Sequence, residues 1–190
     1  SRQQIISEQL VGEGFNEILN NSLTMAAYYD SDLLNSYPAI KTVRVMNPLS
    51  TDLGVMRQTL LFGGLESIRR NVNRKAQNLR FFEFGNTYLY ESEKRKEDNL
   101  AKAYTQQRRL ALWITGKRVQ SSWAHPDEES SFYELKAYVE NILARLGLKL
   151  GALVAERSDN NIFESGLVLN DKNSKTIAEL GTLNIHHLSL

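Results

Sequence analysis

Hydrophobic residues recur at helical spacing in two long segments of the chain. The first segment carries one apolar stripe, made of Leu61, Leu65, Ile68 and Val72. A stripe with this spacing predicts an amphipathic helix. In the second segment, Ser131 and Glu134 have the spacing of a capping box, in which each side chain bonds the other residue's backbone N–H, and Gly147 suits the position just past a helix end. We therefore predict helices over residues 61–72 and 132–146.

Other segments alternate or remain apolar over the length of a strand. Leu79–Tyr90 has apolar residues on both of its faces, which predicts a strand at the centre of its sheet. Arg109–Gly116 also reads as a buried strand. Gly166–Leu169 and Thr176–Leu183 are separated by the polar residues 170–173, so they predict a hairpin.

The first part of the chain is less regular. Ile5–Val11 fits a short amphipathic helix that ends at Gly12. We then predict a strand over Phe15–Leu23, a short helix over Met25–Leu34 and a strand over Thr42–Met46. The last of these ends at Asn-Pro, because proline cannot donate a hydrogen bond to a sheet.

This interspersed order favours an α+β fold, with a mainly antiparallel sheet flanked by helices. Neither an internal repeat nor a linker divides the sequence, so we expect one domain over residues 1–190. Residues 91–102 hold four acids and four bases and predict a solvated loop. Because the sequence lacks an initiator methionine, we expect it to be a fragment of a longer chain.

Composition excludes several kinds of protein. The sequence has no cysteine, which rules out disulfides, thiolate nucleophiles and cysteine-bound metals, and fits a cytoplasmic protein. The net charge is +1, so any contact with nucleic acid must come from a local patch. The chain lacks an apolar run of the ~20 residues that cross a bilayer, and we expect no membrane contact.

Motif searches find no catalytic, cofactor-binding or metal-binding residues. Gly12-Glu13-Gly14 follows a predicted helix and precedes a strand, the reverse of a phosphate-binding loop, and Gly63-Gly64 lacks the lysine that such a loop needs. Adjacent histidines such as His186 and His187 point to opposite sides of an extended segment, and His125 stands alone. We expect Gly63-Gly64 to permit close packing where the helix begins.

One cluster of charge stands out. Five bases and no acid lie between Ser67 and Arg80: Arg69, Arg70, Arg74, Lys75 and Arg80. Cations near a helix C-terminus complement the helix dipole, which is the interpretation we favour. The alternative is contact with an RNA phosphate backbone through Arg70, Arg74 and Lys75.

The motifs of the chain resemble those of the phenylalanyl-tRNA synthetase β subunit, in its catalytic-like core. The shared elements, in order, are Asn47-Pro48-Leu49-Ser50, Met56-Arg57, Leu60-Leu61-Phe62-Gly63-Gly64-Leu65, Asn71-Val72-Asn73-Arg74, Arg80-Phe81-Phe82-Glu83-Phe84-Gly85 and Phe132-Tyr133-Glu134-Leu135-Lys136. Phe62 replaces a usual proline, and the family's His-Pro-Gly loop before the last strand pair is not evident near Phe163–Gly166.

The resemblance implies a class II synthetase-like fold in an enzyme that joins phenylalanine to its tRNA with ATP and magnesium. It implies as partner an α subunit that holds the active site of an α2β2 heterotetramer, and contact with tRNA through the complete enzyme. No cofactor is expected on this domain. We place the subunit interface at the Asn-Pro segment and the leucine-rich segment: Asn47, Pro48, Leu49, Met56, Arg57, Leu60, Leu61 and Phe62. Core packing explains the leucines equally well.

The residues themselves point away from catalysis in this domain. Class II active sites carry Arg-x-Glu on one strand, so that both side chains face ATP and the amino acid. Arg80 and Glu83 are three residues apart, and on a regular strand they face opposite ways. The glycine-rich ATP motif is absent as well. A scaffold for the α subunit is therefore our main hypothesis, an RNA-binding module is the alternative, and an independent ligase is the third.

Overall fold

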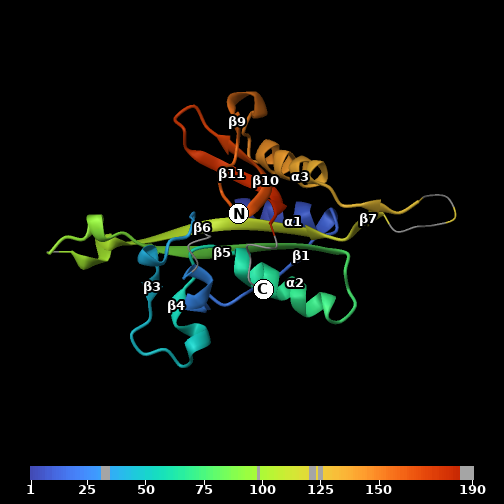
Figure 1. The fold of residues 1–190 in the computed structure, drawn as a ribbon. Coiled ribbons are helices and arrows are strands. Elements are labelled where there is room, and N and C mark those ends of the chain that lie inside the picture. Colours follow the sequence, from blue (N-terminus) through green and yellow to red (C-terminus); the bar gives the residue numbers. More distant parts are fainter. Residues whose placement is uncertain (31–34, 98, 120–122, 124–125, 185–190) are drawn as a thin grey trace.

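The computed structural model describes residues 1–30, 35–97, 99–119, 123 and 126–184. A long antiparallel pair dominates the fold, formed by β5 (Leu79–Tyr90) and β6 (Tyr104–Thr115), with Leu79 opposite Thr115 and Tyr90 opposite Tyr104 (Figure 1). The short β1 (Asn16–Glu17) pairs in parallel with the other edge of β5. β5 is therefore the central strand of a sheet ordered β1-β5-β6, as its two apolar faces predicted.

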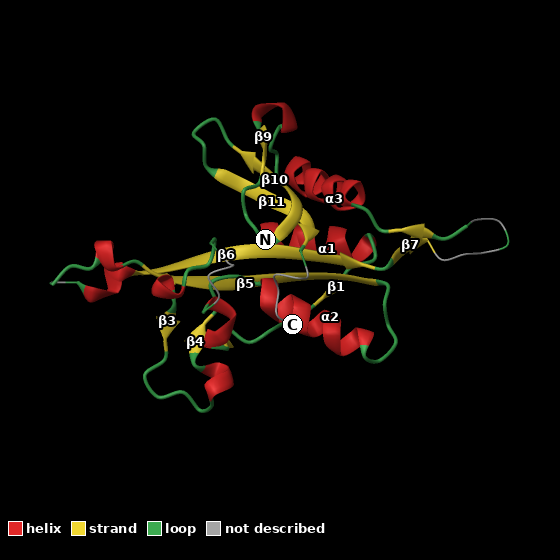
Figure 2. Cartoon of the chain, viewed as in Figure 1, coloured by secondary structure: helices red, strands yellow, loops and turns green. Residues whose placement is uncertain are grey.

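Helices cover both faces of this sheet (Figure 2). One face packs against α1 (Arg2–Gly12) and α3 (Phe132–Arg145), with Leu10, Phe82 and Ile142 in a common buried cluster. The opposite face packs against α2 (Leu61–Val72), where Phe81 and Trp113 meet Leu60.

Gly64 explains how closely α2 approaches the sheet. A Cβ atom at Gly64 would lie only 2.1 Å from Cε2 of Trp113, so only glycine fits between the helix and β6. The prediction that Gly63-Gly64 permits close packing is thus confirmed at Gly64.

Smaller sheets complete the molecule. On the α2 side, β2 (Leu23–Thr24), β4 (Val55–Met56) and β3 (Val43–Arg44) form a sheet in the order β2-β4-β3. On the α3 side, β11 (Thr176–Leu183), β10 (Phe163–Asn170) and β9 (Val154–Arg157) form another, and β10 and β11 are the predicted hairpin. β7 (Lys117–Val119) and β8 (Glu128–Glu129) form a two-stranded hairpin that projects beyond the end of the main sheet (Figure 1).

Two predictions for the first part of the chain are wrong. Phe15–Leu23 is not one strand, because only Asn16 and Glu17 pair with β5, and the chain then leaves the sheet so that Asn20 can bond the side chain of Glu83. The helix expected over Met25–Leu34 is a single 3-10 turn, Ala26–Tyr29, whose tyrosines are buried, while residues 31–34 lie outside the described part.

The capping box at α3 is half formed. Ser131 Oγ accepts a hydrogen bond from the Glu134 backbone N–H at 3.3 Å, as predicted. The Glu134 side chain does not return to Ser131. It accepts instead from Arg80 Nη2 at 2.7 Å, because a cation from β5 is a stronger partner than a backbone N–H.

Candidate functional site

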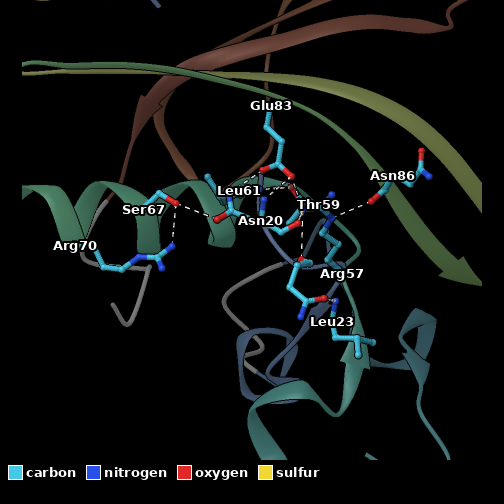
Figure 3. A network of polar contacts seen from close by, with 10 residues as sticks. Asn20, Leu23, Arg57, Thr59, Leu61, Ser67, Arg70, Glu83 and Asn86 are labelled. Carbon is cyan, nitrogen blue, oxygen red and sulfur yellow. Dashed lines mark hydrogen bonds and ion pairs between the residues drawn. The ribbon is translucent and has the colours of Figure 1, made fainter. Parts of the chain in front are cut away.

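A buried network of polar side chains lies between β5 and α2 (Figure 3). At its centre, Arg57 Nη1 donates to Glu83 Oε1 at 2.7 Å. The two side chains are 7% and 1% exposed, so water does not reach the ion pair. A buried charge pair of this kind needs good geometry and further hydrogen bonds to offset the loss of hydration.

The backbone holds Arg57 in place from both sides. Its N–H donates to the carbonyl of Ser22, and its own carbonyl accepts from the N–H of Tyr88, each at 2.9 Å. The guanidinium lies over β5, and its Nε donates to the carbonyl of Asn86 at 2.9 Å. Gly85 makes room for it, since a Cβ there would lie 2.3 Å from Arg57 Nη2.

Asn20 links this ion pair to α2. Its Nδ2 donates to Glu83 Oε2 at 2.8 Å and its backbone N–H to Glu83 Oε1 at 3.3 Å. Its Oδ1 accepts from Ser67 Oγ at 3.0 Å, and Ser67 accepts in turn from Arg70 Nη2 at 3.2 Å. Both carboxylate oxygens of Glu83 thus have partners inside the protein.

A second buried group follows Arg57 in the chain. The Gln58 backbone N–H donates to Tyr29 Oη at 3.0 Å, and Gln58 Nε2 donates to Thr42 Oγ1 at 2.7 Å. Burial raises the pKa of Tyr29 to about 12, so this phenol is neutral at physiological pH. The group therefore holds the 3-10 turn Ala26–Tyr29 and the segment before β3 against the residues that follow β4, without adding a charge.

The arginine of β5, Arg80, lies on the opposite face of the sheet from Glu83. Arg80 forms its ion pair with Glu134 of α3 and lies over the ring of Tyr138, 5.8 Å from the centroid. Arg80 and Glu83 therefore face opposite ways, as predicted from their spacing. Both are engaged in ion pairs, so β5 does not present an arginine and an acid together to a ligand.

The structure divides the predicted subunit interface in two. Asn47, Pro48 and Leu49 lie on an exposed loop after β3, and Leu49 is 97% exposed. Met56 is half-buried in β4. The other four predicted residues are buried within the chain: Arg57, Leu60, Leu61 and Phe62.

The buried half of this set fits the other interpretation given for the leucines, packing within the core of the chain. Phe62 stacks on Tyr28 at 4.4 Å between ring centroids, and Leu60 packs against Phe81 and Trp113. Leu60 therefore packs on the main sheet and Phe62 against the 3-10 turn Ala26–Tyr29, so both are buried within the chain. A leucine-rich helix start looks the same in sequence whether its apolar side faces the core or another subunit.

The predicted RNA-contact residues are exposed. Arg70, Arg74 and Lys75 lie at and beyond the C-terminal end of α2. Arg80, counted with them in the sequence, is removed from the cluster by its ion pair with Glu134.

Among the described residues, no three His, Cys, Asp or Glu side chains gather in a group able to hold a metal ion. His125, His186 and His187 lie outside the described residues. Within the same part of the chain, none of the helices has the length and apolar character needed to pass through a bilayer.

Comparison with known proteins decides the family. Residues 1–187 match the model of the phenylalanyl-tRNA synthetase β chain CLM domain. The chain belongs to this family. The phenylalanine–tRNA ligase β subunit of Bacteroides fragilis is 55% identical to it over 181 residues, 95% of this chain and 22% of that protein. The β subunit of Porphyromonas gingivalis is 46% identical over 96% of this chain. The chain thus spans about a fifth of the length of these relatives.

Solved structures identify the fold of this β-chain family member. A pyrrolysyl-tRNA synthetase of Desulfitobacterium hafniense, PylSc, superposes with a TM-score of 0.59 at 16% identity, covering 94% of this chain and 54% of that one. A second structure of that enzyme gives 0.56 at 14% identity, over 94% and 56%. The predicted class II synthetase-like α+β fold is confirmed.

Sequence reasoning missed several residues of the buried network. Asn20, Ser67 and Gln58 carry no motif, and each became important only through partners far along the chain. The signal available was at Glu83, a charged residue among aromatic ones, and at Arg57, which lies just before the leucine-rich segment. Charged residues in such segments are rarely buried without a partner, so each could have been assigned to the other.

Proposed function

We propose that this chain is the catalytic-like core of a phenylalanine–tRNA ligase β subunit and that it supports the catalytic α subunit without performing chemistry itself. The complete enzyme would join phenylalanine to its tRNA in the cytoplasm, using ATP and magnesium held by the α subunit, in an α2β2 heterotetramer. Family membership supports the ligase role. The scaffold role rests on how β5 uses its charged residues.

The proposal rests on one observation: both charged side chains of β5 already form ion pairs within the chain. Glu83 is 1% exposed and bonded through both oxygens, and Arg80 is paired with Glu134. A site for ATP and Mg²⁺ needs cationic and carboxylate groups that remain open to the ligand. The charged groups of this strand do not fit that requirement, so we derive no catalytic step from them.

An exposed apolar surface supports the assembly role. Met46 and Leu49, on the loop after β3, are 93% and 97% exposed, and Ile40 is 78% exposed. Ile40 also lines an open groove, together with Ala39, Thr42, Val43, Arg44, Tyr90 and Tyr104. Large apolar side chains exposed to this degree on one loop, as Met46 and Leu49 are, are candidates for protein contacts. We place the α-subunit contact here.

The experiment is co-expression of the full-length β chain, carrying Met46→Asp and Leu49→Asp, with its α subunit. Both side chains are almost fully exposed, so the substitutions leave the fold intact while placing charges in the proposed contact. We expect the α2β2 species to be lost in size-exclusion light scattering, and aminoacylation to fall with it.

Tyr133→Asp is the matched control, because Tyr133 is 78% exposed in the first turn of α3, where an acid is compatible with the helix dipole. It should leave assembly unchanged. If the Met46→Asp, Leu49→Asp protein still assembles with the α subunit, the loop is not part of the interface. Phenylalanine-dependent pyrophosphate exchange by the β chain alone would show instead that this chain is catalytic.

A further inference from the structure

Two segments far apart in the sequence meet at one end of the main sheet. The turn that follows α2 packs on the junction between β6 and β7: Thr115 Oγ1 donates to the carbonyl of Gln77 at 2.6 Å, and the Lys117 N–H donates to Asn78 Oδ1 at 2.8 Å. Gly116, with φ +72°, permits this contact, since a Cβ there would lie 2.4 Å from Asn78 Oδ1. The turn and the β7–β8 hairpin thus share one end of the molecule (Figure 1).

This meeting gathers cations at one end. We call Arg70, Arg74, Lys75 and Arg118 the basic end; all four are exposed, and none forms an ion pair within the described part of the chain. The β7–β8 hairpin also carries acids. Asp127 forms an ion pair with Lys117, and β8 consists of Glu128 and Glu129. The turn itself adds no acid, because residues 67–82 contain none.

Lys75 occupies a position where glycine is the favoured residue. Its N–H donates to the carbonyl of Val72 and the Ala76 N–H donates to that of Asn71, the pair of bonds that closes a helix through a left-handed residue. Lys75 has φ +66°, a conformation that costs energy for a residue with a side chain. A lysine here is unfavourable for folding and places a cation at the tip of the turn.

From these observations we infer that the basic end binds the phosphate backbone of RNA. Exposed, unpaired cations from two segments provide the charge that phosphates require. That the RNA is the ligase's tRNA rests on the proposed function, whereas phosphate binding does not.

The test uses the complete enzyme, purified with both subunits, and a labelled phenylalanine tRNA transcript. The dissociation constant of this tRNA is measured over a series of KCl concentrations, for the parent enzyme and for the enzyme that carries Arg74→Gln and Lys75→Gly. Affinity falls as salt rises, and removing two phosphate contacts should make this negative slope of log affinity against log salt shallower by roughly 1.4–1.8. Binding at low salt should also weaken. The KM for tRNA should rise while phenylalanine-dependent pyrophosphate exchange stays unchanged.

A matched control removes two cations from a different turn. Lys172→Gln with Lys175→Gln changes the exposed turn between β10 and β11, and should leave the slope unchanged. Lys75→Gly alone separates folding from binding, because glycine relieves the left-handed strain. Its Tm should be unchanged or higher while its salt slope falls.

The outcomes separate this inference from the proposed function. An unchanged slope and dissociation constant in the Arg74→Gln, Lys75→Gly enzyme would overturn it. Loss of the α subunit in light scattering, with tRNA affinity per complex unchanged, would also overturn it and assign the basic end to an acidic protein surface. If the Met46→Asp, Leu49→Asp experiment shows that the loop does not contact the α subunit, the conclusion about tRNA binding is unaffected.

Discussion

β5 contributes one residue to each of two ion pairs on opposite faces of the sheet, and the two pairs are built differently. Arg57 and Glu83 are 7% and 1% exposed, whereas Arg80 and Glu134 are 24% and 5% exposed. Both oxygens of Glu83 are hydrogen-bonded, but Glu134 Oε2 is buried and has no partner among the described residues.

The difference shows what makes a buried ion pair structural. The Arg57–Glu83 pair joins β4, β5, the segment around Asn20 and, through Ser67, α2. The Arg80–Glu134 pair joins one strand to one helix. Removal of the arginine should therefore destabilise the protein more where both partners of the pair are enclosed and the pair joins more elements.

The largest effect is expected for Arg57→Met. This change leaves the Glu83 carboxylate buried with only Asn20 as a partner, so the free energy of unfolding should fall by about 3–5 kcal/mol. Urea unfolding of the chain, followed by circular dichroism, measures it. Adding Glu83→Leu removes the unpaired charge and should recover part of the loss; a double variant as unstable as the sum of the single ones would contradict this reasoning.

Gly85→Ala tests the same pair without removing a charge. The added methyl would lie 2.3 Å from Arg57 Nη2 and 2.6 Å from Leu60 Cδ2, so the guanidinium must move. We expect a loss of about 1–3 kcal/mol in urea unfolding. Gly12→Ala is the matched control, because a Cβ at Gly12 meets nothing within 4 Å, and its stability should be unchanged or higher. Equal effects at the two glycines would refute the steric argument.

Arg80→Met should have the smallest effect. Its side chain is partly exposed, so solvent screens the pair, and we expect a loss of about 1–2 kcal/mol of unfolding free energy. The same urea titration, repeated at high salt, should show a smaller difference from the parent protein. A cost equal to that of Arg57→Met would mean that enclosure does not distinguish the two pairs.

Much of the fold followed from local pattern. The predicted boundaries of β5 and α2, residues 79–90 and 61–72, are those of the structure, because each segment carries its own apolar periodicity. β9 was missed because all four of its residues are exposed, so its sequence has no alternation to detect. Segments that depend on distant partners, such as Phe15–Leu23, were predicted poorly.

The candidate site was harder to predict than the fold. Arg57 was assigned to a subunit interface from its motif, but it is 5% exposed. An arginine next to a leucine-rich segment serves a buried ion pair and an interface equally well, and only the position of Glu83 distinguishes them. Arg57→Glu, which would bring two buried carboxylates together, would therefore unfold the chain rather than report on assembly.

The bond from Asn20 to Glu83 spans 63 residues of sequence. During synthesis the segment around Asn20 emerges long before its partner strand, and neither it nor Arg57 can reach its final contacts until β5 has left the ribosome. Contacts between such distant residues slow folding, because a long loop must close before they form. The chain should therefore form this network only after β5 has left the ribosome, and nascent chains that stop before residue 83 should expose the apolar side of α2 to chaperones.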